Sequence, residues 1–361
     1  MAGVLFVTGF PGFIGRRLIR ALLGAAPEAQ VVALVEERQL DRARACAQEI
    51  DSGRIEILPG DISRKDLGLE PRRREALARD TAAAFHLAAI YDLAVPAEIA
   101  QRVNVDGTGN VLELCAGCRR LERLNYVSTA YVAGDRKGVV YEHELVLGQG
   151  FKNHYESTKF QAELWVQVRM REIPATIYRP AIVVGDSRTG ETEKFDGPYY
   201  LLRTIARVAE RRGPIPQLGS DGSPFNVVPV DFVVSAIVAA STDDAASGEV
   251  LHLVDPEPIS AAELAGLLSR LYAGREPTLR VPGPVLERSL QIRRVRDYFS
   301  GAPPESIRYL NHPVRFDTRK ATELLDRHGL SCPPFHDYAP NLVSFFRMHE
   351  DDPAYSPGAS S

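Results

Sequence analysis

Tyr155 and Lys159 are the two side chains of this sequence whose types and spacing point most directly to catalysis. They stand four residues apart in the stretch HYESTKFQAE, where the pattern predicts a helix, so both lie on one helix face. A tyrosine with its ordinary pKa of about 10 is a poor acid at neutral pH, but a neighbouring ammonium favours the phenolate and lowers that pKa. Tyr155 can then give a proton to a carbonyl oxygen as a hydride adds to the carbonyl carbon.

Two hydroxyl side chains, Ser128 and Thr129, follow a predicted strand in the stretch NYVSTAYVAG. In a parallel sheet the carboxyl end of a strand opens into the ligand crevice, so either hydroxyl is placed to polarise a substrate carbonyl. Capping of the local backbone by these hydroxyls is the alternative interpretation.

A glycine-rich turn stands at the start of the chain in VTGFPGFIGRRL, with Gly9, Gly12 and Gly15 three residues apart. Glycines permit a tight turn and a close approach of the backbone to a pyrophosphate, which then rests on the N-terminus of the next helix, at Phe13 and Ile14. Because the turn follows a predicted strand and opens a predicted helix, it indicates a dinucleotide site. In such a site Lys159 also reaches the nicotinamide ribose.

The residues expected near the adenosine ribose leave NAD(H) and NADP(H) open. Glu36 comes 21 residues after Gly15, at the end of the second predicted strand, where an acid would accept hydrogen bonds from the ribose of NAD. A solvated acid is the alternative for Glu36. The cations Arg16, Arg17 and Arg38 would instead hold the 2′-phosphate of NADP.

Asp61, Ile62 and Asn104 are three further candidates for the cofactor site. Asp61 and Ile62, in GDIS, end the third predicted strand where an adenine edge would pass, although an Asx turn explains Asp61 equally well. Asn104 begins NVDGTGN and either orders the site through backbone contacts or only caps locally.

The elements that position these residues alternate along the chain up to Pro180. Short apolar runs between helical patterns predict a doubly wound parallel α/β sheet of the Rossmann type. The expected strands are Val4 to Thr8, Val31 to Val35, Ile55 to Leu58, Ala83 to Leu87, Arg123 to Ser128 and Thr176 to Arg179. The expected helices are Phe13 to Gly24, Arg38 to Ile50, Arg72 to Arg79, Glu98 to Cys118 and His154 to Arg171.

Beyond residue 180 the alternation weakens and loops rich in Pro, Gly and charge appear. We expect residues 1–180 to form the dinucleotide-binding core, and residues 181–350 to form a smaller, mostly helical substrate-binding part interleaved with the last strands of the core. Residues 351–361 are expected to be a flexible tail. The expected elements of the second part are helices at Val230 to Ala240, Ala261 to Tyr272 and Tyr338 to Met348, and a strand at Val250 to Val254.

The charge, the apolar runs and the cysteines of the chain argue against several classes of function. A net charge of −4 and a pI near 6.1 argue against a nucleic-acid partner. No apolar run approaches the ~18 residues of a membrane helix, and no basic segment precedes the first strand, so we expect a cytoplasmic protein without stable membrane insertion. Cys115 and Cys118 form a CxxC pair, but no second pair completes a ligand set, so we expect packing and no metal site.

The motifs occur in the order seen in extended short-chain dehydrogenases/reductases, which the first two-thirds of the chain resembles. These motifs are GxxGxxG, GDIS, HLAA, VNVDGTGNVL, YVSTAYVAG, YxxxK and YRPAIVVGD. The resemblance implies a catalytic trio of Thr129, with Ser128 adjacent, Tyr155 and Lys159. It also implies that Leu87, Ala88, Ala89, Asn104 and Pro180 lie at the cofactor.

Within that family the chain looks most like thioester reductase domains and fatty acyl-CoA reductases. The resemblance implies reduction of an acyl thioester, on CoA or a carrier, to an aldehyde or alcohol with NAD(P)H and without a cysteine nucleophile. Glu36 stands where these relatives tend to have Arg. The alternatives are an alcohol or ketone dehydrogenase of the hydroxysteroid or dihydroflavonol type, a nucleotide-sugar epimerase or dehydratase, and a non-catalytic dinucleotide-binding protein. A homodimer is left open.

Overall fold

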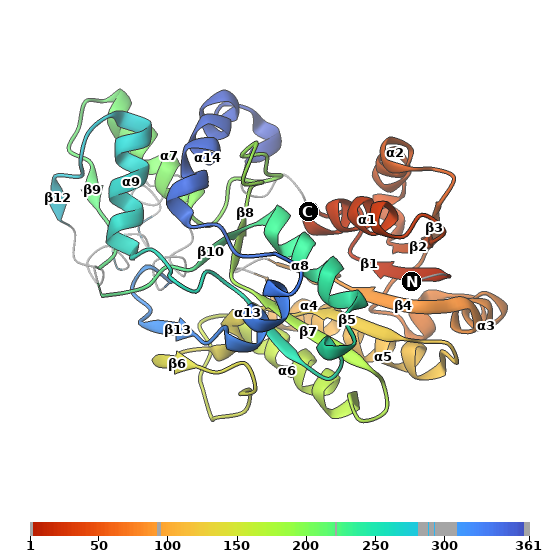
Figure 1. Cartoon of the computed structure of the whole chain (residues 1–361). Coiled ribbons are helices and arrows are strands. Elements are labelled where there is room, and N and C mark those ends of the chain that lie inside the picture. Colours follow the sequence, from red (N-terminus) through yellow and green to blue (C-terminus); the bar gives the residue numbers. More distant parts are fainter. Residues whose placement is uncertain are drawn as a thin grey trace.

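A parallel sheet of seven strands, in the order β11-β7-β5-β4-β1-β2-β3, is the centre of the computed structural model (Figure 1). The structure describes residues 3–91, 95–220, 222–280, 288, 292 and 309–356. Its strands are apolar because both faces are covered by helices. In order along the chain they are β1 (Val4–Thr8), β2 (Gln30–Val35), β3 (Ile55–Pro59), β4 (Thr81–His86), β5 (Arg123–Val127), β7 (Ala175–Pro180) and β11 (Val250–Leu253).

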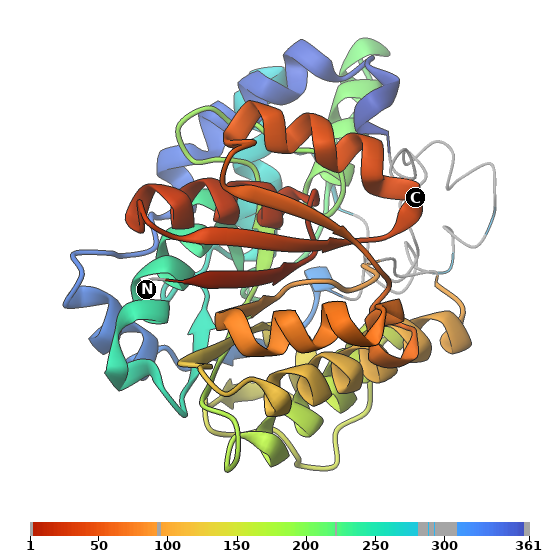
Figure 2. The ribbon, with the colours of Figure 1, turned by 90° about the vertical axis from the view of Figure 1, so that its right-hand side faces the viewer.

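Helices lie on both faces of this sheet, as Figure 2 shows for its N-terminal half. On one face are α1 (Phe13–Ala25), α2 (Leu40–Ile50) and α8 (Val230–Thr242), whose buried side chains share one core cluster. On the other face are α3 (Pro71–Asp80), α5 (Gly107–Gly117) and α6 (His154–Arg169), in a second cluster. The short α4 (Ala97–Ala100) and a π-helical stretch, Gln101–Asp106, lead into α5.

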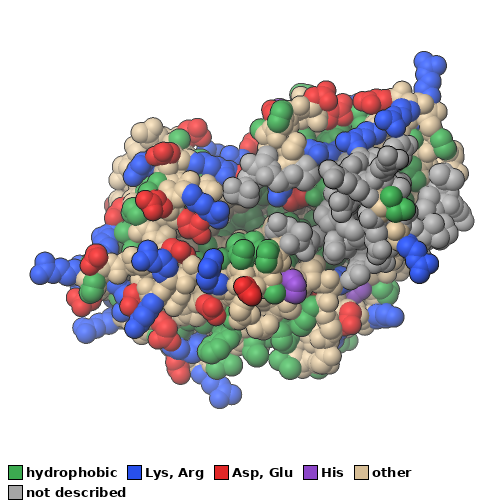
Figure 3. Space-filling view, turned by 180° about the vertical axis from the view of Figure 1, so that it is seen from behind, with side chains coloured by type: hydrophobic (Ala, Val, Ile, Leu, Met, Phe, Trp, Pro, Cys, Tyr) green, Lys and Arg blue, Asp and Glu red, His purple; other side chains and the backbone are tan. Residues whose placement is uncertain are grey.

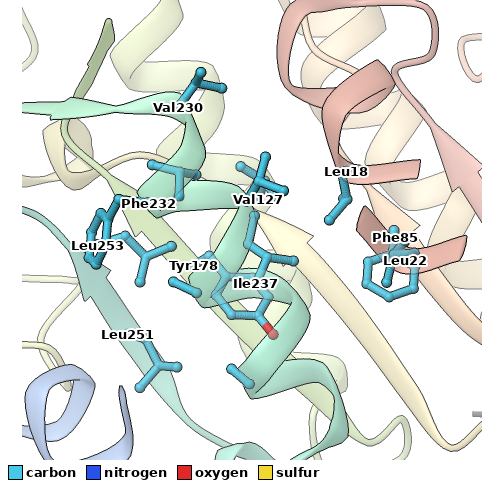
Figure 4. Packing of buried hydrophobic residues seen from close by; sticks show 14 of the residues in the cluster. Leu18, Leu22, Phe85, Val127, Tyr178, Val230, Phe232, Ile237, Leu251 and Leu253 are labelled. Atoms are coloured by element: carbon cyan, nitrogen blue, oxygen red, sulfur yellow. The ribbon is translucent and has the colours of Figure 1, made fainter. Parts of the chain in front are cut away.

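The first cluster holds α1 and α8 against the strands. Leu18 and Leu22 of α1 lie over Phe85 of β4, and Ile237 of α8 lies beside Tyr178 of β7 (Figure 4). All five side chains are fully buried. This packing fixes the start of α1, and with it the glycine turn, at the carboxyl end of the sheet.

The second part of the chain builds a separate lobe, seen at the upper left of Figure 1. Its helices α7 (Tyr199–Glu210), α9 (Ala261–Ala273) and α14 (Phe335–His349) form the third core cluster, which includes the buried ring of Phe195. Two-stranded pairs join β8 (Ile182–Val184) to β10 (Val227–Pro229), β9 (Pro216–Gln217) to β12 (Leu279–Arg280), and β6 (Gly138–Val140) to β13 (Val314–Phe316). The helix α13 (Arg319–Asp326) returns to the sheet beside β11.

The structure confirms the predicted doubly wound sheet and corrects details of the second part. The strand expected at residues 250–254 is present as β11 and pairs with β7, so the sheet takes its last strand from the later part of the chain. The helix α7 was not predicted. Within the expected tail, residues 353–355 form a 3₁₀ turn, and the Tyr355 ring stacks 5.0 Å from that of Phe195. Residues 357–361 lie outside the described residues.

The surface carries both signs of charge. On the face seen in Figure 3, Lys and Arg side chains are interspersed with Asp and Glu. Among the described residues, no helix combines the length and the apolar character that crossing a membrane requires.

Candidate active site

A cavity of about 450 Å³ lies at the carboxyl ends of β1, β4, β5 and β7, between the sheet and the second lobe. This is the position at which an open α/β sheet binds its ligands. Thirteen of the predicted site residues line this one cavity: Gly9, Gly12, Phe13, Ile14, Gly15, Leu87, Ala88, Ala89, Ser128, Thr129, Tyr155, Lys159 and Pro180.

The glycine turn packs so closely against neighbouring backbone that side chains at Gly9 and Gly15 would not fit. Gly9 has φ of +87°, and a Cβ there would stand 2.9 Å from the backbone of Leu87 and Ala88. A Cβ on Gly15 would stand 2.3 Å from the Gly9 carbonyl oxygen. The next helix begins at Phe13 with no side chain capping its first N–H groups. The turn and these donors line the cavity and fit a pyrophosphate.

Thr129 and Tyr155 come together at the centre of the cavity. Burial raises the pKa of the Tyr155 phenol, while a hydrogen bond with the Thr129 side chain acts in the opposite direction. Thr129 follows the end of β5 and Tyr155 lies in the first turn of α6, so two elements far apart in sequence position the pair. The Thr129 hydroxyl also donates to the Pro180 carbonyl at 3.5 Å and accepts from the Tyr131 backbone N–H at 3.3 Å, and both Thr129 and Tyr155 line the cavity.

Lys159 is buried one helical turn beyond Tyr155, but it contacts other groups. Its Nζ donates to the Val127 carbonyl at 2.8 Å and to the Tyr126 hydroxyl at 3.0 Å. Burial lowers the pKa of Lys159 to about 7 against the attraction of Glu163. The expectation that this ammonium lowers the pKa of Tyr155 is not met in the structure, because burial raises the pKa of Tyr155 and the side chain that acts against this rise is Thr129.

Ser128 is committed to a buried ion pair that the sequence did not reveal. Its hydroxyl donates to Glu163 Oε2 at 2.5 Å, and Glu163 accepts from Arg179 at 2.6 Å. The side chains of Glu163 and Arg179 are fully buried. Because the Ser128 hydroxyl already has a strong acceptor, Thr129 is the better placed of the two to meet a substrate carbonyl.

Asn104 and Ile62 lie outside the cavity lining and support it. The Asn104 side chain accepts from the Ile90 backbone N–H at 2.9 Å and donates to the Thr158 hydroxyl at 3.0 Å. It thereby ties the loop after β4 to α6. The Ile62 carbonyl accepts from the Asn110 side chain at 2.7 Å, beside the start of α5.

Asp61, Glu36 and Arg38 also stand away from the cavity. Asp61 accepts from the Ser63 backbone N–H at 2.8 Å, which is the Asx turn given above as the alternative. Arg38 donates to Glu36 at 2.7 Å, so the acid and the cation expected at the ribose pair with each other.

The other two cations expected at the 2′ position are also paired. Arg16 and Arg17, in the first turns of α1, both donate to Glu191, at 3.0 and 2.8 Å. Glu191 belongs to the loop after β8, which leads into the cavity wall. No local pattern in the sequence indicates this contact, because the two arginines and the glutamate are about 175 residues apart.

The wall opposite the sheet was not predicted. It comes from the loop after β8, the start of α7, the stretch just before β10 and the segment at residues 309–310. These contribute Lys194, Asp196, Tyr200, Phe225 and Tyr309. Tyr91, two residues after the end of the HLAA motif, also lines the cavity, with its ring 5.0 Å from that of Tyr155. The helical spacing of apolar residues in YYLLRTIARVAE is the signal that would have located α7.

A buried polar network joins this wall to the catalytic helix. The Tyr309 hydroxyl donates to Glu156 at 2.7 Å and accepts from the Asn153 side chain at 2.9 Å. Lys152 Nζ lies 3.3 Å from the same Glu156 oxygen. Asn153 caps α6 by accepting from the Glu156 backbone N–H. The network holds the N-terminal turn of α6, and thus Tyr155, against the second lobe.

Comparison with known proteins agrees with this geometry. The family model described as male sterility protein, an NAD-binding family, matches residues 7–237. The aldehyde reductase lnaA of Aspergillus flavus is 30% identical over 92% of this chain, and one of the linear gramicidin synthase polypeptides of Brevibacillus parabrevis is 30% identical over 91%. The chain spans only 34% and 7% of these two relatives.

The solved structures include a similar reductase domain. The terminal R domain of the myxalamid PKS-NRPS biosynthetic pathway is 26% identical, with a TM-score of 0.83 over 98% of this chain and 93% of that one. The family model matches more than half of the chain, and two relatives are 30% identical to it over nine-tenths of its length. Together these matches show the family. The chain belongs to the male sterility protein family, NAD(P)-dependent reductases within the extended short-chain dehydrogenases/reductases.

Proposed function

We propose that this chain reduces an acyl thioester, attached to CoA or to a carrier protein, by hydride transfer from NAD(P)H. The observation that carries the proposal is the meeting of Thr129 and Tyr155 in a cavity whose other end is the glycine turn. The names of the relatives, an aldehyde reductase and a gramicidin synthase, support an acyl group delivered as a thioester.

Thr129 and Tyr155 have separate roles in the reduction of the thioester. The bound dinucleotide supplies the hydride. Thr129 and Tyr155 donate hydrogen bonds to the thioester carbonyl oxygen, which becomes negative as the hydride adds. Tyr155, a neutral phenol because burial raises its pKa, gives its proton to that oxygen. Collapse of the resulting hemithioacetal then breaks the carbon–sulfur bond and releases an aldehyde and a thiol.

Lys159 contributes from its buried position on the same helix face. Its Nζ reaches the end of β5 at the Val127 carbonyl, close in sequence to Thr129, and it lines the cavity. A dinucleotide in the cavity would offer ribose hydroxyls as further partners for that amine. We infer that Lys159 orients the nicotinamide end of the dinucleotide.

The test is a cofactor-oxidation screen with product analysis. Purified protein is supplied with NADH or NADPH and with acyl-CoA, acyl-pantetheine and acyl-carrier thioesters, and the loss of absorbance of the reduced cofactor is followed. We expect aldehyde or alcohol to form in proportion to the cofactor oxidised. Oxidation with ketones or sugar nucleotides, and none with any thioester, would contradict the proposal.

A further inference from the structure

The cavity wall at residues 194–196 presents two charged side chains from a firmly anchored segment. Phe195 is fully buried, its ring lies 4.9 Å from Phe346 and 5.0 Å from Tyr355, and its backbone N–H donates to the Tyr355 carbonyl at 3.0 Å. Its neighbours Lys194 and Asp196 both line the cavity. The anchored ring therefore fixes where the two charges stand.

The Asp196 carboxylate accepts no hydrogen bond from another side chain among the described residues. Burial raises its pKa, and the charge of Lys194 acts against that rise. The side chain is partly exposed toward the cavity, and the backbone N–H of Asp196 itself also acts against the rise. An ionised carboxylate has about four acceptor sites, so it can still accept from a donor that a ligand brings into the cavity. Other acids near the cavity differ in this respect, since Glu156 and Glu191 are both paired.

Two aromatic side chains line the same cavity as Asp196. Tyr91 and Tyr200 both line it, and the charge of Asp196 acts on the Tyr91 phenol. The Tyr91 ring contacts the Tyr155 ring edge to face at 5.0 Å, so this region begins next to the catalytic phenol. A carboxylate together with aromatic faces is the combination that binds an ammonium group.

We propose that Asp196 binds an ammonium group carried by the acyl chain, so that the protein prefers amine-bearing acyl thioesters to hydrocarbon ones. This inference rests on the proposed thioester reduction and names its substrate class. Lys194 is the cation already facing Asp196, and it repels a second one. We therefore expect Lys194→Met to strengthen the preference and Asp196→Asn to remove it.

The test measures binding and does not require turnover. The probes are non-reducible amide analogues, with N–H in place of the thioester sulfur, of 6-aminohexanoyl-pantetheine and heptanoyl-pantetheine, which are matched in length. Calorimetric titration gives the ratio of their dissociation constants. We expect the wild-type protein to bind the amine about tenfold more tightly or better, as for a hydrogen bond to a charged group. In Asp196→Asn the ratio falls to about one. The exposed Asp337→Asn, which removes the same charge elsewhere, keeps the wild-type ratio.

Several results would overturn the inference. A wild-type ratio near one, no binding of either analogue, or an unchanged ratio in Asp196→Asn would each do so. Equal weakening of both analogues in that variant would mean that Asp196 holds the pantetheine amide they share. Reduction of the two parent thioesters is measured separately: turnover of either one supports the proposed function whatever the binding ratio, and turnover of neither counts against that function alone.

Discussion

Lys159 is held in the site at a cost in folding stability, and that cost depends on pH. The side chain is 3% exposed, and burial lowers its pKa from 10.5 to about 7. Between these two pH values the unfolded chain binds a proton at this residue and the folded protein does not. The free energy of unfolding therefore rises with pH across this window, because the unfolded state holds more protons there.

The size of the effect follows from the two pKa values. A difference of one bound proton between the unfolded and folded states changes the free energy of unfolding by about 1.4 kcal/mol per pH unit. Because Lys159 is half protonated in the folded protein at pH 7, the gain between pH 7 and pH 9 amounts to about 2 kcal/mol. Lys159→Met removes the group, so the stability of the wild-type protein relative to this variant is expected to increase by that amount over the same range.

The assay is urea unfolding of the nucleotide-free protein at pH 7, 8 and 9. Wild type, Lys159→Met and the exposed Lys137→Met are compared, so that other groups titrating in this range cancel in the differences. We expect the difference to change with pH only for Lys159→Met. A constant difference between wild type and that variant would show that Lys159 stays charged in the folded protein, and the reasoning from burial would fail.

Three further predictions test other parts of the site. Tyr155→Phe removes the proton donor and is expected to lower kcat about 10²- to 10⁴-fold with the fold intact by circular dichroism; unchanged turnover would mean that Tyr155 is not the proton donor. Glu163→Gln leaves the Arg179 guanidinium buried without its counterion and is expected to cost about 3–5 kcal/mol in urea unfolding, and a near-neutral effect would contradict the buried pairing. Glu191→Gln frees Arg16 and its neighbour, so we expect 2′,5′-ADP to bind more tightly relative to 5′-ADP in calorimetry; an unchanged ratio would show that these cations do not face the 2′ position.

The sequence was sufficient for those parts of the site that short stretches of chain specify. The turn from Gly9 to Gly15 and the pair Tyr155 and Lys159 are each set by spacing within one turn or helix. The alternation of strands and helices then brings strand ends together at one edge of the sheet, so Thr129 follows from the same pattern. These residues line one cavity in the structure.

The parts that could not be predicted depend on contacts between distant segments. Glu163 accepts from Ser128, 35 residues away, and from Arg179, 16 residues away, and no local pattern marks either pair. The wall that carries Asp196 follows β8 through a loop without hydrophobic periodicity, so the sequence predicts neither its position nor its cavity face. The arginines of α1 looked free in the sequence and are paired in the structure, whereas Asp196, in the unpredicted wall, accepts no side-chain hydrogen bond among the described residues.

Contacts between distant segments also change the interpretation of the cations expected at the 2′ position of the cofactor. In the sequence Arg16, Arg17 and Arg38 stand as cations ready for a phosphate, with Glu36 as the single opposing acid. In the structure each has a carboxylate partner, and the acid that pairs with the first two, Glu191, comes from the lobe that also forms the cavity wall. A 2′-phosphate would have to displace Glu191 from the arginines of α1, whereas a 2′-hydroxyl would not. We therefore expect the choice between NAD(H) and NADP(H) to depend on the loop that carries Glu191.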